Sequence, residues 1–448
     1  MVGETRALAN FCAKLSYEDL PPTVVEKVKE CLLDWLGSAL AGSSLKPAAI
    51  LVSLVEEFGG TPESTLINHK GKTSCINAAL VNGVMSHIIE LDDVHRDSIL
   101  HPAAPVIPAA LALSEKLGAN GRTFIDAIVA GYETAIRIGE AVGTSHYKFW
   151  HNTGTCGTFG AAVAAGKVLG LDEESMAYTL GNAGTQASGL WEFLAEGAMS
   201  KHLHPGKAAS NGVLSALLAQ KGFTGSTTIL EGERGFCPAT SRDYKLEKIT
   251  EGLGKKYKIL ETSFKIHASC RHTHPAVDAA IQIHNRVNPK YIETVSIETY
   301  SDALDIAGIE EPRTTYEAKF CLNYCVSVAL FYGRLGLDEF NEGLLMDPRV
   351  RSLMRSTNII IDPVLDGVYP ARWPSRVEVV TKKGQRYRAS VDYPLGDPEN
   401  PLPVEKLRDK FRILASKALP KNQIEAIIET VFKLENLTTV RQLTEKFH

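Results

Sequence analysis

The sequence has no excess of charge of one sign and no long apolar run. Its 448 residues include 48 Lys and Arg against 52 Asp and Glu, a net charge of −4. A chain without a positive excess lacks the field that attracts nucleic acid or an acidic membrane. Its longest uncharged stretches, such as residues 175–191, contain Asn, Gln, Ser and Thr, and none reaches the roughly 18 apolar residues of a membrane span. We therefore expect a soluble protein with neither a nucleic-acid nor a membrane partner.

Cysteine motifs are absent as well. The eight cysteines include no CxxC pair and no dense framework of the kind that holds small secreted domains together. Cys321 and Cys325 are four residues apart on a predicted helix but lack the second pair of a zinc site, so we expect both to be core thiols. The first residues also lack the basic-then-apolar order of a signal peptide. These features predict reduced thiols and a cytoplasmic location.

From Ser16 to about Lys221 the sequence is helical in pattern and rich in small residues. Thr23 and Glu26 have capping-box spacing ahead of an apolar stripe that ends near Gly42, which is typical of a buried helix. Further helices are predicted over residues 76–91, 105–117, 123–142, 157–169, 174–180 and 208–221. The alanines and glycines of residues 157–165 favour close helix packing in a large all-helical core.

After about Phe264 the pattern changes to α+β. Alternating residues predict one strand and a hairpin turning at Lys383-Gly384, with strands at 291–299, 376–381 and 387–391. A helix is predicted to begin at Thr314, with Glu317 as its capping partner, and to run through Leu330. Between these segments the chain alternates helix and strand, so this part is an α+β unit.

The predicted architecture is mainly α with an α+β part. A turn-rich link at residues 396–401 ends the α+β part, and helices follow at 404–411 and 423–432. We therefore expect a large helical domain of residues 1–263 and 397–448. The smaller α+β domain, residues 264–396, is inserted toward the C-terminal side.

Histidine gives the strongest chemical signal in the chain. Nine of its 13 histidines fall in four short clusters, His95/His101, His146/His151, His202/His204 and His267/His272/His274. His101 and His151 each precede a predicted helix, whose positive dipole end attracts anions and disfavours imidazolium. Residues 201–207 concentrate basic groups ahead of another helix, which suits a ligand with several negative charges, although a solvated loop is the alternative. The last cluster lies where the helical pattern gives way to the α+β pattern, and ligand clefts are favoured at such domain junctions.

Metal and cofactor chemistry leave weaker signals. No HExxH spacing and no cysteine run of an iron–sulfur cluster is present. The glycines at 154, 157 and 160 follow no strand, so helix packing explains them better than a dinucleotide fingerprint. A metal site could form only through a loop, from Asp92, Asp93, His95 and His101.

A nucleophile is a weak alternative. Ser269 or Cys270 could serve, but neither a GxSxG elbow nor a family cysteine signature accompanies them.

The motifs around the histidine clusters resemble those of the MmgE/PrpD family. They are Glu-Leu-Asp-Asp at 90–93, His-Pro at 101–102, Gly-Thr-Phe-Gly at 157–160, Lys-x-Leu-His-Pro-Gly at 201–206 and Leu-Glu-Gly-Glu-Arg-Gly-Phe at 230–236. The family's activities include 2-methylcitrate dehydration, cis-aconitate decarboxylation and iminodisuccinate epimerisation. The resemblance extends over nearly the whole chain and implies a large helical domain, a smaller α+β lid, an active site between them and a homodimer through the helical domain.

The resemblance also implies a reaction on a small di- or tricarboxylate without metal or organic cofactor, by proton transfer at a carbon next to a carboxylate. By motif, the implied catalytic residues are His101, Lys201, His274, His151 and Glu90. For substrate binding we expect Asp93, His204, Arg271, His272 and Tyr324.

The change in substrate charge during such a reaction suggests a role for each candidate residue. Removing a proton beside a carboxylate adds negative charge to an anion, so the site must supply cations. Histidine, with a reference pKa of about 6.5, exchanges protons near neutral pH, whereas lysine, at about 10.4, stays cationic. We expect His101 or His274 to be the base or acid, Lys201 to stabilise the enolate-like intermediate, and His151 with Arg271 to hold carboxylates.

The reaction itself stays open at this point. Loss of hydroxyl gives dehydration, loss of carbon dioxide gives decarboxylation, and reprotonation on the other face gives epimerisation. We expect a lyase, with an epimerase or isomerase as the second hypothesis. A metal-dependent hydrolase and a non-catalytic polycarboxylate-binding protein are the alternatives of other classes.

Overall fold

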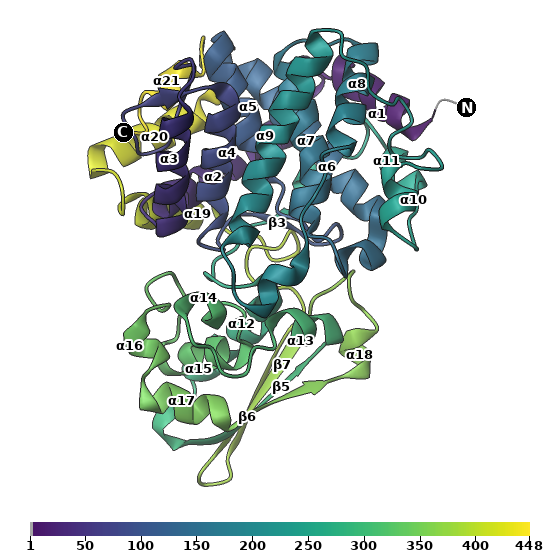
Figure 1. Cartoon of the computed structure of the whole chain (residues 1–448). Coiled ribbons are helices and arrows are strands. Elements are labelled where there is room, and N and C mark those ends of the chain that lie inside the picture. Colours follow the sequence, from purple (N-terminus) through teal and green to yellow (C-terminus); the bar gives the residue numbers. More distant parts are fainter. Residues whose placement is uncertain (1–2) are drawn as a thin grey trace. The chain divides into compact units, whose positions relative to one another are not determined.

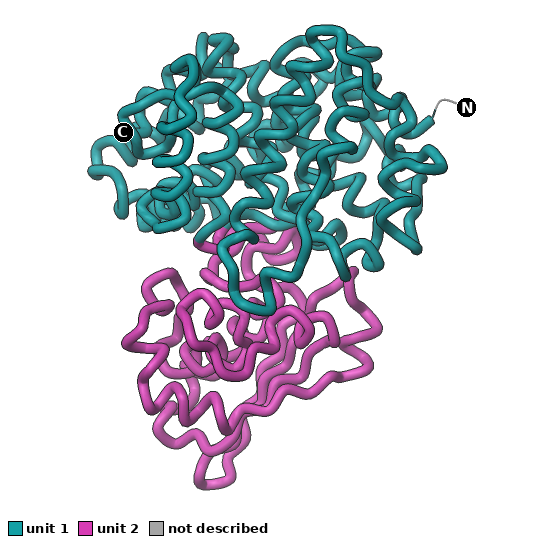
Figure 2. The backbone as a smooth tube through the Cα atoms, in the orientation of Figure 1, with its two compact units in different colours: residues 1–88, 92–262, 403–448 teal, residues 89–91, 263–402 magenta. Residues whose placement is uncertain are grey.

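The computed structural model describes residues 3–448, which divide into two units (Figures 1 and 2). Unit 1 comprises the residues up to 88, residues 92–262 and residues 403–448. Unit 2 comprises residues 89–91 and 263–402. As predicted, the first is helical and the second contains a small mixed sheet.

Unit 1 is built from helices, and α4, α5, α6, α7 and α9 are packing neighbours within it (Figure 1). Its helices are α1 (Glu4–Lys14), α2 (Pro22–Gly42), α3 (Lys46–Phe58), α4 (Cys75–His87), α5 (Ala103–Leu117), α6 (Gly121–Tyr147), α7 (Asn152–Val168), α8 (Glu173–Gly184), α9 (Ser200–Gln220), α10 (Phe236–Thr240), α11 (Glu247–Thr250), α19 (Val404–Ala415), α20 (Lys421–Phe432) and α21 (Arg441–Thr444).

Small residues let these helices approach closely. A Cβ added at Gly160 of α7 would lie 2.6 Å from the carbonyl oxygen of Gly131 on α6. A Cβ at Gly157 would lie 2.6 Å from the ring of Pro105 on α5. These distances are shorter than van der Waals contact, so α7 accepts only glycine there without rearrangement. The predicted packing role of this glycine series is confirmed.

Unit 2 contains a four-stranded sheet in the order β6-β5-β7-β8. Its strands are β5 (Ile292–Thr299), β6 (Thr357–Ile361), β7 (Ser375–Thr381) and β8 (Arg386–Val391). Strand β6 is parallel to β5, and the other two pairings are antiparallel. The predicted hairpin is confirmed as β7–β8, with Gly384 in its turn at φ 76°. The parallel strand β6 was not among the predicted strands.

The core of unit 2 lies between this sheet and helices. Val295 and Ile297 of β5 are fully buried and pair with Val379 and Val377 of β7. The helices that pack with the sheet are α12 (His274–His284), α15 (Leu322–Tyr332) and α17 (Pro348–Arg355). The remaining helices of this unit are α13 (Ser301–Ala307), α14 (Thr315–Ala318), α16 (Glu342–Leu345) and α18 (Pro363–Asp366). Alternation of buried and half-buried residues along β7 explains why its sequence signal is clear.

Three local predictions are wrong. Helix α2 begins at Pro22 with no side-chain cap, because a proline in the first turn needs no hydrogen-bond partner for its nitrogen. Thr314 does cap α14, accepting from the N–H of Glu317 at 3.1 Å, but the predicted long helix breaks before α15 begins at Leu322. Residues 201–207 are already helical, since Gly206 packs against Gly83 of α4 and extends the contact of α9 with that helix.

The structure bears on two further features, membrane-spanning helices and disulfide bonds. Across residues 3–448 no single helix is long and apolar enough to cross a membrane, and α2 with α3 passes that test only as a pair bent by 85°. All eight cysteines are buried and none forms a disulfide within the described chain. Cys321 and Cys325 are fully buried core thiols, and burial raises the pKa of Cys321 to about 12.

Candidate active site

Four helix ends of unit 1 bring imidazole rings together. His87 ends α4, His101 lies two residues before α5, His151 is the N-cap of α7, and His204 lies near the start of α9. The ring centroids are 4.9 Å apart for His87–His101, 5.7 Å for His87–His151 and 5.3 Å for His151–His204. We call these four rings the histidine row. Because three of the four helices present their N-terminal ends, their dipoles favour an anion beside the row.

His101 is held in the tautomer that a general base requires. Its Nδ1 lies 2.6 Å from the carbonyl oxygen of Asp93, and a carbonyl only accepts, so Nδ1 bears a hydrogen. In the neutral ring Nε2 is then the atom that takes up a proton. Asp92 Oδ2 lies 3.5 Å from Nδ1 and would stabilise the resulting imidazolium. His101 is therefore arranged to accept a proton at Nε2.

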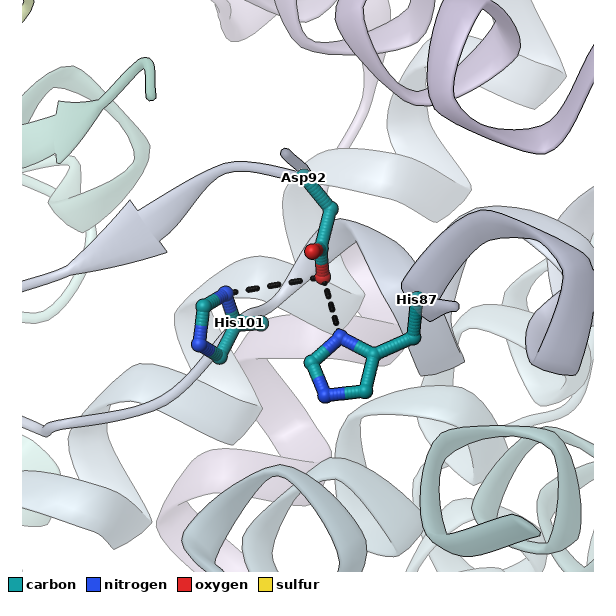
Figure 3. Close-up of side chains that lie close together, drawn as sticks. All are labelled: His87, Asp92 and His101. Atoms are coloured by element: carbon teal, nitrogen blue, oxygen red, sulfur yellow. Dashed lines mark hydrogen bonds and ion pairs between the residues drawn. The ribbon is translucent and has the colours of Figure 1, made fainter. Parts of the chain in front are cut away.

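The carboxylate of Asp92 also contacts His87. His87 Nδ1 donates to Asp92 Oδ2 at 2.6 Å, so one carboxylate oxygen faces two imidazoles (Figure 3). His87 and Asp92 are both fully buried. A buried carboxylate is stable only when it is hydrogen-bonded or paired, and the two rings contribute to this at Oδ2.

His151 and His204 form a second pair in the row. Their Nδ1 atoms are 3.1 Å apart, so one must donate and the other must accept. Burial lowers the pKa of His151 well below its usual value, and nearby basic groups, His204 first among them, lower it further. Burial likewise lowers the pKa of His204 to about 4, with smaller effects of His87 and Lys201. Both rings are therefore neutral at neutral pH.

Lys201 supplies the cation of this group. Its side chain is buried, and Nζ lies 6.0 Å from the ring centroid of Phe193. The same aromatic ring is 5.7 Å from His204, and Trp191 lies edge-on to His151 at 5.0 Å. Burial of Lys201 reduces access of water, which strengthens its electrostatic effect on a bound anion.

Asp93 supports the site from inside unit 1. Its Oδ1 accepts from the backbone N–H of Ala103 at 3.0 Å, and its Oδ2 accepts from the hydroxyl of Tyr132 at 2.7 Å. Burial raises the pKa of Asp93 well above its usual value. Both oxygens thus anchor the start of α5, and with it the segment that carries His101.

A second polar group lies within unit 2, around Glu90. The Glu90 side chain is buried, with Lys265 Nζ 3.8 Å from Oε2 and the Tyr316 hydroxyl donating to Oε1 at 3.4 Å. The backbone of Glu90 has φ 60°, a conformation that non-glycine residues rarely adopt. Lys319 Nζ donates to the carbonyl oxygens of Ile89 at 2.9 Å and Ala268 at 2.7 Å. This conformation is held by tertiary contacts, as is common at functional sites.

His274 lies at the start of α12 in the same unit. Its ring is fully buried and meets the ring of His267 edge-on at 4.9 Å. Burial lowers the pKa of His274 well below its usual value, and His267, Arg271 and Lys265 add smaller effects of the same direction. A neutral imidazole near cationic side chains can donate a hydrogen bond to an anion, and a bound anion favours its protonation.

The remaining predicted substrate-binding residues of unit 2 have partners within that unit. Arg271 forms an ion pair with Asp397, and its guanidinium lies 5.7 Å from the Trp373 ring. His272 stacks on Trp373 at 4.3 Å, and its Nδ1 is 2.8 Å from the hydroxyl of Tyr300. These contacts favour a supporting role.

Tyr324 is fully buried in the unit 2 core. Its hydroxyl donates to the backbone carbonyl of Glu339 at 2.8 Å. This geometry favours a structural role, and Tyr316 is the tyrosine whose hydroxyl reaches Glu90.

The four residues predicted as a metal site do not come together. His95 is bound elsewhere, with Nδ1 2.9 Å from Ser98 Oγ and Nε2 3.3 Å from Glu261. The side-chain oxygens of Asp93 accept hydrogen bonds from the Ala103 N–H at the start of α5 and from the Tyr132 hydroxyl. Potential ligand atoms of His87, Asp92 and His101 lie within 4.8 Å of one another, but the Nδ1 of His101 already bears a hydrogen toward a carbonyl. These contacts do not favour metal coordination.

Comparison with known proteins identifies the family. A model of the MmgE/PrpD N-terminal domain matches residues 6–249, and one of the MmgE/PrpD C-terminal domain matches residues 267–435. The chain belongs to the MmgE/PrpD family. The resemblance inferred from the sequence motifs is confirmed.

Relatives within the MmgE/PrpD family span most of the chain. The protein is 30% identical to a cis-aconitate decarboxylase of Aspergillus terreus, over 99% of this chain and 95% of the relative. It is 26% identical to the cis-aconitate decarboxylase of Homo sapiens, over 98% and 93%. It is 23% identical to the mitochondrial 2-methylcitrate dehydratase of Yarrowia lipolytica, over 90% and 82%. These relatives are named for small polycarboxylates.

Sequence reasoning missed three residues of these polar groups. They are His87 in unit 1 and Lys265 and Tyr316 in unit 2. The sequence indicated Asp92 only as a candidate metal ligand. His87 stands alone in the sequence, outside the four histidine clusters and inside the predicted helix 76–91. In the structure α4 ends at His87, and the turn after it brings Asp92 into contact.

Proposed function

We propose that the protein is a cofactor-independent lyase that acts on a small di- or tricarboxylate by proton transfer at a carbon next to a carboxylate. The observation that carries the proposal is the arrangement of His101, whose Nδ1–H is fixed by a carbonyl and whose imidazolium form would be stabilised by Asp92. A base so oriented contributes typically about 10²- to 10⁴-fold to such a step.

The other residues of unit 1 supply the charge that the reaction needs. Lys201 stabilises the enolate-like intermediate, because it is a buried cation beside the histidine row. His151 and His204 hydrogen-bond the substrate carboxylates, and in their neutral state they can also take up a proton. Asp93 positions the segment of His101 and does not contact substrate.

The residues of unit 2 keep their predicted part in the same reaction. His274 is the second acid or base. Glu90 is a catalytic carboxylate, and its side chain is held by Lys265 and Tyr316. Arg271, His272 and Tyr324 support this group through Asp397, Tyr300 and Glu339. The homodimer and the cytoplasmic location stay predictions.

The relatives favour a decarboxylase or dehydratase over the alternatives. These relatives are named cis-aconitate decarboxylase or 2-methylcitrate dehydratase. In a dehydratase the carbon–oxygen bond breaks after a proton is removed from the neighbouring carbon, whereas in a decarboxylase loss of carbon dioxide leaves a carbanion that then takes up a proton. Epimerisation of an iminodisuccinate-type substrate is the second candidate, since it needs the same carbanion and differs only in reprotonation.

Product analysis by NMR tests the proposal. Purified protein is incubated separately with cis-aconitate, 2-methylcitrate and iminodisuccinate, and spectra are followed with and without a chelator. The proposal predicts turnover of a polycarboxylate that the chelator leaves unchanged. Loss of activity in chelator that added metal restores would favour a metal-dependent hydrolase, and tight binding of all three without turnover would favour a binding protein.

A further inference from the structure

His87 plays no part in the roles assigned above, yet it makes the shortest contact to Asp92. Its Nδ1 donates to Oδ2 at 2.6 Å, whereas His101 Nδ1 lies 3.5 Å from the same oxygen (Figure 3). Asp92 is fully buried, so the direction of its carboxylate is set by the side chains around it. The shorter of these two contacts is the one from His87, so His87 contributes to the position of the charge that faces His101.

The other edge of the His87 ring shows what kind of role is possible. Nε2 is buried and has no hydrogen-bond partner among residues 3–448. A ring that passes protons along needs a partner at both nitrogens, so this geometry does not favour a proton relay. The ring faces are occupied instead, with His151 stacked at 5.7 Å and His101 edge-on at 4.9 Å.

We propose that His87 is a positioning residue, whose Nδ1–H holds the Asp92 carboxylate beside His101 so that the carboxylate stabilises the imidazolium formed during proton transfer. The proposal rests on the proposed function for its kinetic consequences. Its structural part, the hold of His87 on Asp92, does not. The role is analogous in physical terms to that of a hydrogen bond which orients a carboxylate against a catalytic imidazole.

Two substitutions separate positioning from other roles. In His87→Asn the side-chain amide N–H occupies nearly the place of Nδ1–H, while in His87→Leu the donor is lost and the volume is kept. We expect kcat to fall by about 10- to 100-fold in His87→Leu with KM changed much less, and to recover most of that loss in His87→Asn. Equal loss in both variants would overturn the proposal, and so would a wild-type kcat in His87→Leu.

A readout without substrate makes the test independent of the enzymatic function. The pKa of His101, followed by NMR of labelled histidine, should be lower in His87→Leu than in wild type and near wild type in His87→Asn. The groups facing His101 are the Asp92 carboxylate, the His87 ring, the carbonyl of Asp93 and, further along the row, His151 and Lys201. Both variants remove the His87 ring, and only His87→Leu also removes the donor to Asp92. An unchanged His101 pKa in His87→Leu would contradict the proposal even in a protein that turns over no polycarboxylate.

A matched control measures the cost of removing any buried imidazole. His146 is buried in the same unit, and its nitrogens lie 2.9 Å from hydroxyls of Thr155 and Thr240. His146→Asn should leave kcat and the His101 pKa unchanged. Thermal unfolding of all variants confirms that each is folded at the assay temperature.

Discussion

His151 and His204 face each other through their Nδ1 atoms, which are 3.1 Å apart. One hydrogen between two nitrogens makes the two rings opposite tautomers, so together they present one N–H donor and one acceptor at their Nε2 atoms. The pair carries no charge at neutral pH and can gain one when an anion is bound.

Binding of a polycarboxylate should therefore be accompanied by proton uptake. The negative ligand raises the pKa of His204 from about 4 toward neutrality, because an opposite charge nearby favours the protonated ring. We expect uptake of up to about one proton per site at pH 6 to 7. Calorimetry of cis-aconitate binding to the slow His101→Ala variant, in buffers of different ionisation enthalpy, measures that number.

The control for this measurement is the doubly substituted protein His101→Ala with His204→Asn. Uptake should be smaller there if His204 receives the proton. Zero uptake in His101→Ala itself would show that the pair stays neutral and serves only as a hydrogen-bonding surface.

Removing the base or the buried cation should slow turnover strongly. We expect His101→Ala and Lys201→Ala each to lower kcat by roughly 10²-fold or more, since each removes a group that acts on the developing charge. Lys207→Ala is the matched control, because Lys207 lies on the same helix and is exposed. A wild-type rate in either of the first two variants would remove that residue from the mechanism.

The buried histidine His146 should make stability depend on pH in a defined direction. Burial lowers its pKa to about 4, below the value of about 6.5 in the unfolded chain. The unfolded state therefore binds more protons between pH 6.5 and 4, and this contribution to stability is full above pH 6.5 and lost as the pH falls to about 4. Its size is at most about 3 kcal/mol.

Comparison with a variant isolates that contribution from the carboxyl groups. Burial raises the pKa of Asp126 to about 7, which acts in the opposite direction, so the pH dependence of the wild type alone is not decisive. The difference in urea midpoint between wild type and His146→Gln should shift in favour of the variant as the pH is lowered from 7 to 4.5. A difference independent of pH would contradict the assignment.

Removing only one partner of the Arg271–Asp397 ion pair should strongly lower the free energy of unfolding. Both side chains are buried, and Asp397→Ala leaves the guanidinium without its carboxylate, which typically costs about 3 to 5 kcal/mol. The double variant Arg271→Leu with Asp397→Leu should recover most of the loss, because no charge stays buried. Urea denaturation of the single and double variants measures this.

The outcome also bears on the role of Arg271. If its main role is structural, the double variant keeps a KM within a few-fold of wild type. A KM raised by an order of magnitude or more in a protein of normal stability would instead return Arg271 to the substrate-binding residues.

Much of the fold could be predicted because local signals decide it. The turn at Gly384, the alternation of β7 and the cap of Thr314 with Glu317 each depend on a few neighbouring residues. The start of α9 at Ser200 depends instead on contact with α4 at Gly83 and Gly206, which no local pattern reveals.

The candidate site shows the same division. Histidines ahead of predicted helices, such as His101 and His151, could be selected from sequence because a helix start has a recognisable chemistry. The contact of His87 with Asp92 could not, because it depends on how the chain turns at Glu90, whose φ of 60° is unusual for a side chain of that kind. Tyr324 and Tyr316 differ in role only through the direction of their hydroxyls.

Hydrogen exchange at substrate carbon tests the central claim most directly. The protein is incubated with cis-aconitate or 2-methylcitrate in heavy water, and deuterium at the carbon next to a carboxylate is followed by NMR in substrate and product. The account predicts deuterium incorporation by the wild type, slowed by about 10²-fold in His101→Ala. Decarboxylation of cis-aconitate without deuterium in the product, or equal incorporation by wild type and His101→Ala, would contradict it.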